Sequence, residues 1–154
     1  MAEFTVWFAV HAENPKTRAF VVREAASGRI VGSTALLDPD PGNLSLEIGA
    51  TWYAPEVRGT RINPAAKLLL LDHAFSRAWI EPDTTRGCVR VTLKCDSRNE
   101  HSRRAITKLG ASFEGVLRQH RIMMDGYVRD TAYFSVVAAE WPAVRARLES
   151  RLAG

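Results

Sequence analysis

The stretch Val57-Arg58-Gly59-Thr60-Arg61-Ile62-Asn63-Pro64 leads directly into the apolar run Lys67-Leu68-Leu69-Leu70-Leu71. A glycine turn that enters a helix leaves several backbone N–H groups unpaired, with the positive end of the helix dipole behind them. Such a junction is suited to binding phosphate groups. Asn63 is a good N-cap and Pro64 suits the first helical position, so a helix is predicted to open here. Taken alone, the segment is also explained by an ordinary junction with two solvated arginines.

The segments on either side of this helix have the patterns of β-strands. Residues 44–53 alternate between apolar and polar side chains, and Cys88–Cys95 is a second run typical of a strand. The helix between them should run from Asn63 to about Trp79, which gives a β-α-β unit. Gly49 interrupts the first strand and indicates a bulge or a close backbone approach.

The remaining segments predict two hairpins and two more helices. In chain order these are a hairpin from Ala19 to Leu37, a helix from the capping box Ser97-x-x-Glu100 to Leu109, strands Ser112–Ile122 and 127–138 joined by a turn at Met123–Gly126, and an amphipathic helix from Glu140. This order predicts a single domain over residues 1–154, of the α/β class (α+β in some schemes), with a mixed sheet and helices on both faces.

Composition narrows the classes of function. The chain has 154 residues and a net charge of +4, and no run is long and apolar enough to cross a bilayer. No basic and apolar leader begins it, so we expect a cytoplasmic protein. The basic residues are spread along the chain, with local density over residues 98–108 and 145–151, which would attract a phosphorylated ligand. They lack aromatic stacking platforms and form no dense patch, which disfavours nucleic acid. Cys88 and Cys95 belong to no metal-spaced set, so we expect both to be structural and no metal to be bound.

Two polar side chains share the inward stripe of the second helix. Ala105, Ile106 and Leu109 form that stripe, and the helical period places Ser102 and Asn99 on the same face. A buried hydroxyl or amide needs a partner, which can be the backbone, water or a ligand. Both residues could simply cap the first turn, or they could contact a ligand.

The segment Asn99-Glu100-His101-Ser102-Arg103-Arg104-Ala105-Ile106-Thr107-Lys108-Leu109-Gly110-Ala111-Ser112-Phe113-Glu114-Gly115 resembles the N-x-x-S-x-x-A-I-x-K-L-G-F-x-x-E-G signature of the GNAT superfamily, the acyl-CoA-dependent N-acetyltransferases. The Arg58–Asn63 segment is similar to the R-G-x-G-x-G/A pyrophosphate loop of that family. Four finer features resemble its ribosomal-protein N-terminal acetyltransferase (RimL/RimJ-like) branch, at Leu46–Tyr53, Lys67–Leu70, Glu114–Arg118 and Asp130-Thr131. The resemblance runs from about Phe20 to Leu152.

The resemblance implies a mixed, mostly antiparallel twisted sheet with a central β-α-β cofactor unit. It implies that acetyl-CoA is the cosubstrate and that a primary amine, at a protein N-terminus or in a small molecule, is the acceptor. Asn99 would hydrogen-bond the pantetheine arm, and Ser102 would protonate the departing thiolate. The residues implied to bind the pyrophosphate are Arg58, Gly59, Thr60, Arg61, Ile62 and Asn63.

Two departures from the family pattern concern the catalytic residues and the loop. Arg61 and Asn63 replace two glycines of the loop, and Arg121 occupies the position of the branch's catalytic glutamate. The base candidates are Glu47, acting through a water, and His120, which can be neutral at physiological pH. Glu47 could instead form an ion pair on a strand face, and His120 could be a surface residue of a hairpin.

A third departure lies at the N-terminus, where only Met1 to Arg18 precede the first hairpin. The segment Thr5–Val10 resembles the end of the family's second helix, so the first strand and helix are expected to be missing. One sheet edge would then be open, and we expect a homodimer that covers it. The three departures also allow a different class of protein, a CoA-binding module without catalysis.

Overall fold

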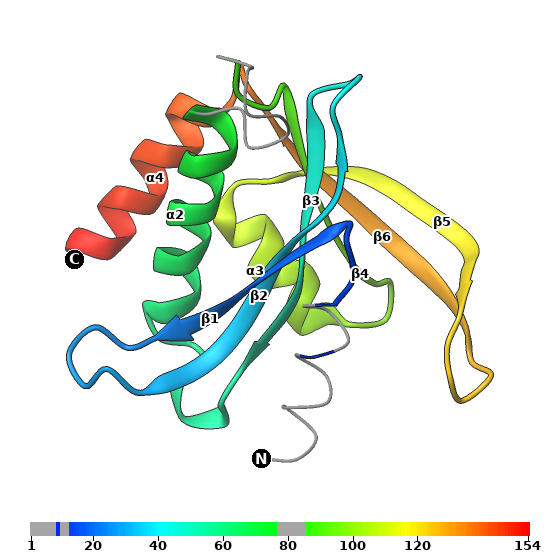
Figure 1. Ribbon diagram of the computed structural model, residues 1–154, viewed down its shortest axis with the longest axis horizontal. Coiled ribbons are helices and arrows are strands. Elements are labelled where there is room, and N and C mark those ends of the chain that lie inside the picture. Colours follow the sequence, from blue (N-terminus) through cyan, green and yellow to red (C-terminus); the bar gives the residue numbers. More distant parts are fainter. Residues whose placement is uncertain (1–8, 10–12, 77–85) are drawn as a thin grey trace.

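The computed structural model describes residues 9, 13–76 and 86–154. Within these residues, six strands form one sheet in the order β1-β2-β3-β4-β6-β5 (Figure 1). The elements are β1 (Thr17–Arg23), β2 (Ile30–Asp40), β3 (Ser45–Tyr53), the 3-10 turn η1 (Pro55–Val57), α2 (Ile62–Ser76), β4 (Arg90–Asp96), α3 (Glu100–Leu109), β5 (Ser112–Ile122), β6 (Val128–Val137) and α4 (Trp141–Ala153). In this sheet β3 and β4 are parallel and the other neighbours are antiparallel, which confirms the predicted class.

Helix α2 connects β3 to β4 and completes the predicted β-α-β unit. It begins at Ile62, one residue before the predicted cap, because the amide of Ala65 already donates to the carbonyl of Arg61 at 3.0 Å. The prediction that Asn63 is the N-cap is therefore wrong, and Asn63 and Pro64 lie inside the first turn. The predicted helix end near Trp79 falls outside the described residues.

Helix α3 begins at Glu100, and its N-cap is Asn99 rather than the predicted Ser97. The side chain of Asp96 accepts a hydrogen bond from the amide of Arg98 at 2.8 Å, and its carbonyl accepts one from the amide of Asn99. Because of this turn, the N-cap of the helix lies two residues later than predicted. The helix ends as predicted at Gly110, which has the left-handed conformation with a φ of 110°.

Both predicted hairpins are present. Strands β1 and β2 pair around the turn at Gly28, and β5 and β6 pair around the turn at Gly126. The β5–β6 hairpin extends away from the helices (Figure 1), and β5 forms one edge of the sheet. Within β5 the pairing register shifts between Leu117 and Arg121, where Gln119 has a φ of 50°.

The three described helices pack on one face of the sheet, where α2 and α4 lie side by side (Figure 1). The prediction of helices on both faces is therefore confirmed for this face only. Alternate residues of β4 point to this face, among them Val91 and Leu93, and join the core. The other face carries polar groups such as Thr92 and Lys94. The helical segment expected at Thr5–Val10 lies outside the described residues, apart from Ala9, which is helical. The core residues are Leu36, Leu46, Ile48, Leu70, Leu71, Ala74, Cys88, Val91, Leu93, Cys95, Leu109, Ala111, Ala132, Phe134, Val136, Trp141, Val144 and Leu148.

Strands β3 and β4 separate soon after they meet. Their pairing ends with Glu47 opposite Thr92, and beyond this point β3 pairs with β2 alone and β4 with β6 alone. The β2–β3 register also shifts next to Gly49, and Ala50 has a φ of 47°. This is the bulge predicted at Gly49, and the fork between β3 and β4 follows from it because a bulge bends and twists its strand.

Candidate active site

The loop before α2 has the geometry of a phosphate cradle. Gly59 has a φ of 79°, whereas Arg61 and Asn63 lie outside the left-handed region, so the replaced glycines leave no backbone strain there. Within the described residues, the amides of Gly59, Arg61 and Asn63 donate no hydrogen bond to another backbone carbonyl. These donors lie at the positive end of the α2 dipole, as an anion site requires.

A cavity of about 210 Å³ opens at this loop and is bounded by α3 and the end of α4. Gly59, Thr60 and Asn63 line one side of it. The opposite side is basic, and the lining there includes His101, Arg104, Lys108 and Arg151. Unpaired amides and cations facing one cavity suit a pyrophosphate group, which carries negative charge on several oxygens.

The positive charge around the cavity comes from residues other than those singled out in the loop. The guanidinium of Arg58 donates to the carbonyl of Tyr53 at 3.0 Å, and that of Arg61 donates to the carbonyl of Leu152 at 3.1 Å. Neither arginine lines the cavity. Of the residues implied to bind pyrophosphate, Gly59, Thr60 and Asn63 are brought together, while the side chains of Arg58 and Arg61 are directed to other parts of the backbone.

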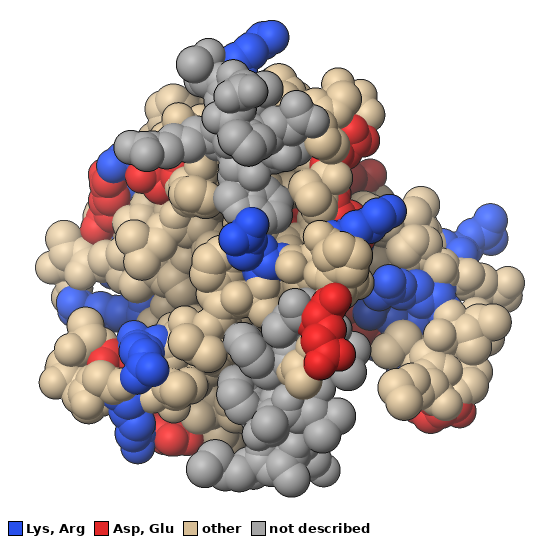
Figure 2. All heavy atoms as spheres, in the orientation of Figure 1, with Lys and Arg blue, Asp and Glu red and all other residues tan. Residues whose placement is uncertain are grey.

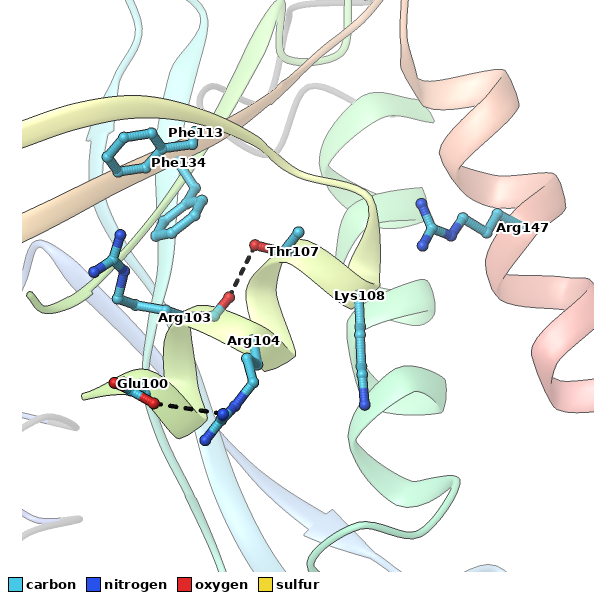
Figure 3. A pocket seen from close by; sticks show the side chains of 8 residues that line it. All are labelled: Glu100, Arg103, Arg104, Thr107, Lys108, Phe113, Phe134 and Arg147. Carbon is cyan, nitrogen blue, oxygen red and sulfur yellow. Dashed lines mark hydrogen bonds and ion pairs between the residues drawn. The ribbon is translucent and has the colours of Figure 1, made fainter. Parts of the chain in front are cut away.

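A larger and more open cavity, of about 510 Å³, lies beside the first one, and Figure 3 shows it between α3, α4 and the start of β5. Arg104 and Lys108 line both cavities, because they lie one turn apart on α3. Arg147 extends from α4 toward α3, and Phe113, which is 53% exposed, adds an aromatic surface. The two cavities therefore form one basic region divided by the side chains of Arg104 and Lys108.

Asn99 and Ser102 meet at the first turn of α3. The side-chain oxygen of Asn99 accepts a hydrogen bond from the amide of Ser102 at 3.0 Å, so Asn99 acts as a cap. Its NH₂ group remains a donor for a ligand. Ser102 is half-buried, and its hydroxyl takes no part in the cap.

The two base candidates belong to one chain of polar contacts on the sheet face opposite the helices. Lys94 Nζ lies 2.6 Å from Glu47 Oε2 and 4.9 Å from the centroid of the Tyr133 ring. The hydroxyl of Tyr133 lies 3.2 Å from His120 Nε2, and His120 Nδ1 lies 3.1 Å from the hydroxyl of Thr131. Lys94 and Tyr133 thus lie between Glu47 and His120, and Glu47 is at the fork.

The charges of this cluster fix its protonation. Desolvation, together with the positive charges of Lys94, Arg121 and Arg129, lowers the pKa of His120, so the imidazole is neutral at pH 7. Desolvation would lower the pKa of Lys94, but its hydrogen bond to Glu47 and the charge of that carboxylate outweigh this effect and raise it. Lys94 is therefore an ammonium group.

Gly49 leaves the space that the carboxylate of Glu47 occupies. A Cβ at this glycine would lie 2.9 Å from Glu47 Oε1 and 2.7 Å from a methyl group of Leu37. The groups that approach Gly49 closely are thus side chains, and of the two alternatives predicted at this glycine the structure shows the bulge. A wide cavity of about 800 Å³ borders the other end of the polar chain, and its lining includes His120 and Asp130. This cavity therefore reaches the cluster at His120.

Two residues of the polar chain, Lys94 and Tyr133, were not predicted from the sequence. Both could have been found, since each is a polar residue at a position that alternates with the core side of its strand. Arg104, Lys108 and Arg151 belong to the two segments of high basic density, and the first two have the i, i+4 spacing of one helix face. The packing of α4 brings the guanidinium of Arg151 to the carbonyl of Lys108.

Comparison with known proteins agrees with this geometry. The family model "Acetyltransferase (GNAT) domain" matches residues 1–112. The chain belongs to the GNAT acetyltransferase family. A GCN5-related N-acetyltransferase from Brucella melitensis has 34% identity and a TM-score of 0.83, over 97% of this GNAT domain and 63% of that chain. A protein from T. thermophilus, described as an acetyltransferase, has 38% identity and a TM-score of 0.81, over 94% and 71%.

A more distant structure shares the fold. RimJ from Mycobacterium smegmatis, in complex with CoA-disulfide, has 24% identity and a TM-score of 0.73, over 97% of this GNAT domain and 67% of that chain. No curated protein matches the sequence. Within the described residues, no group of three or more His, Cys, Asp or Glu side chains is placed to hold a metal ion, and no helix is long and apolar enough to span a membrane.

The cradle gives a test of cofactor binding by this GNAT domain. Gly59→Pro should weaken CoA binding at least tenfold, because proline removes an amide donor and cannot adopt the positive φ. Gly28→Pro is the matched control, since Gly28 also has a positive φ, of 69°, but lies in the β1–β2 turn. Calorimetric titration with CoA measures both variants. Equal affinity for CoA in Gly59→Pro and the wild type would exclude the cradle as the site.

Proposed function

We propose that this protein transfers the acetyl group of acetyl-CoA directly to a primary amine, at a protein N-terminus or in a small molecule. The observation that supports it most is that two features belong to one β-α-β unit. Unpaired amides and a basic cavity lie at the start of α2, and the two strands that α2 connects form the fork, with Glu47 at its vertex. CoA needs a site of this kind, with cations for its phosphates and free backbone groups for its amide-containing arm.

The two adjoining basic cavities would bind the phosphate groups of CoA. The pyrophosphate would lie on the amides of residues 59–63, and the 3′-phosphate of the adenosine would lie near Arg104 and Lys108, which both cavities share. On this proposal the pantetheine arm then enters the fork, where the backbone of β3 beyond Glu47 is unpaired on the side of β4. The NH₂ group of Asn99 is a donor for one of its amide carbonyls.

The reaction requires a base, an oxyanion donor and an acid for the leaving group. The amine nitrogen forms a bond to the thioester carbon, and the electron pair of the carbonyl moves to oxygen. The carbonyl then re-forms as the C–S bond breaks, and the Ser102 hydroxyl donates its proton to the departing sulfur and regains one from water. The proton lost by the amine goes to Glu47 through a water, and the ammonium of Lys94 balances the carboxylate before the transfer. A backbone N–H group freed at the fork suits the oxyanion.

Two sequence motifs and one cavity support a proposal for the acceptor and for the branch of the family. The motifs at Leu46–Tyr53 and Glu114–Arg118 support a RimL/RimJ-like enzyme, with a protein N-terminus or a small amine entering the cavity beside His120 and Asp130. Figure 2 shows acidic and basic side chains interspersed on one face, without the broad basic patch typical of nucleic-acid binders. Cys88 and Cys95 are buried free thiols, as expected for a protein of the reducing cytoplasm.

Thiol release from acetyl-CoA in the presence of a panel of amines tests the reaction. Ser102→Ala should lower kcat roughly 10²–10⁴-fold with little change in CoA affinity, because a general acid acts in the transition state. Asn99→Ala should mainly weaken CoA binding and is the matched variant on the same turn. A protein that binds CoA and releases no thiol with any amine would be a non-catalytic CoA-binding module. If Ser102→Ala lowers only the melting temperature, Ser102 is structural.

The identity of the base can be decided by two conservative variants. Glu47→Gln should lower kcat roughly 10²–10⁴-fold, while His120→Gln should lower it less than about tenfold. The pKa of His120 is lowered, so a His120 base would lose activity only as the pH falls below the usual histidine range, and His120→Gln would abolish that pH dependence. The pH–rate profiles of both variants measure this. The reverse order of the two effects would make His120 the base.

We also propose a homodimer in which a partner chain covers the β1 edge of the sheet. In the described residues β1 is an edge strand, and the side chain of Val21 is 40% exposed. Unpaired strand edges favour association with another chain. Light scattering at micromolar concentration should give twice the mass of one chain. A soluble monomer whose Phe20–Val22 amides are well protected from hydrogen exchange would contradict the dimer.

A further inference from the structure

Lys67 is a charged residue in the hydrophobic layer between α2 and the sheet. It is 6% exposed and lies on the same helix as the core residues Leu70 and Leu71. Among the described residues no carboxylate pairs with it, and burial lowers the pKa of its amine to about 7. Burying an ammonium without an opposite charge is costly, so its contacts need an explanation.

The amine of Lys67 holds two strands through their hydroxyl groups. Its Nζ donates to Thr34 Oγ1 of β2 at 2.9 Å and to Thr51 Oγ1 of β3 at 2.6 Å. The two hydroxyls are 2.9 Å apart, and each also lies within 3.4 Å of the carbonyl of Gly49. The network therefore converges on the bulge of β3, where Ala50 has its positive φ.

The position of this network links the two halves of the site. Lys67 lies one helical turn after Asn63, which lines the phosphate cavity at the start of α2. The bulge that it binds begins two residues after Glu47, the last residue of β3 that pairs with β4. One side chain thus connects the helix that carries the cradle to the strand that forms the fork.

We propose that Lys67 is a positioning residue, which clamps α2 to the bulge of β3 and so holds the phosphate cradle and the fork at Glu47 in fixed relation. This inference rests on the proposed acetyl transfer for its effect on the rate, but the clamp itself does not. A hydrocarbon at this position would fill the same space and leave Thr34 and Thr51 to bond to each other. The helix would then have no polar link to the bulge among the described residues.

Lys67→Met tests the clamp, and Leu71→Met is the matched control one turn further along α2. Hydrogen exchange of the unliganded protein, followed by mass spectrometry, should show at least tenfold faster exchange in residues 47–53 of Lys67→Met and no change in Leu71→Met. The affinity for CoA should fall at least tenfold in Lys67→Met alone. In thiol-release assays of Lys67→Met, the KM for acetyl-CoA should rise and kcat should fall, because the phosphate cradle and the fork at Glu47 are no longer held in fixed relation.

Thr51→Val is a second variant that removes a partner of the clamp and leaves α2 unchanged. It should reproduce the loss of CoA affinity, and the double variant should be no worse than the stronger single one, as for residues in one network. Unchanged exchange and unchanged CoA affinity in Lys67→Met, or in Thr51→Val if Lys67→Met does not fold, would overturn the clamp. A wild type that releases no thiol would overturn the proposed function, while the exchange result would still decide the clamp.

Discussion

Strands β3 and β4 pair over three residues, from Ser45 to Glu47, and the candidate site depends on their separation after that point. Backbone groups inside a sheet are normally satisfied by a neighbouring strand. Where two strands diverge, these groups need another partner, and an amide-containing ligand can supply it. The bulge at Ala50 bends β3 away, and Gly49 leaves room for the carboxylate of Glu47. One irregularity of the backbone therefore accompanies the separation of the two strands and leaves an acidic side chain at the point where they diverge.

Local patterns were sufficient to predict most of the fold. The alternation of residues 44–53, the turn residues at Gly28 and Gly126 and the stop at Gly110 gave the correct strands, hairpins and helix end, because each depends on near neighbours. The errors occurred at helix starts. The side chain of Asp96 stabilises a turn, so the N-cap of α3 is Asn99 instead of the predicted Ser97. The relative strengths of such competing local hydrogen bonds are hard to predict from sequence.

Part of the candidate site carries recognisable sequence patterns. Gly59, Thr60 and Asn63 line a cavity at the start of α2, and Glu47 lies at the fork. Asn99 and Ser102 meet at the first turn of α3 but line neither of the two cavities beside that helix. The partners of these residues come from distant segments. Lys94 and Tyr133 reach Glu47 and His120 only through the pairing of β4 with β6, and Arg151 reaches the phosphate side through α4. Lys67 looked like part of an apolar run, and its role depends on hydroxyl groups of two other strands.

The two outer strands of the described sheet differ in regularity. Strand β1 pairs with β2 without interruption from Thr17 to Val22, so its outer side offers an even row of backbone groups. Strand β5 is broken by the register shift at Gln119, so its outer side changes direction halfway along. A straight strand from another molecule can therefore align with β1 over its length but with only half of β5. Edge-to-edge growth of the sheet into larger aggregates needs two receptive edges on every molecule, and the irregular β5 edge opposes it.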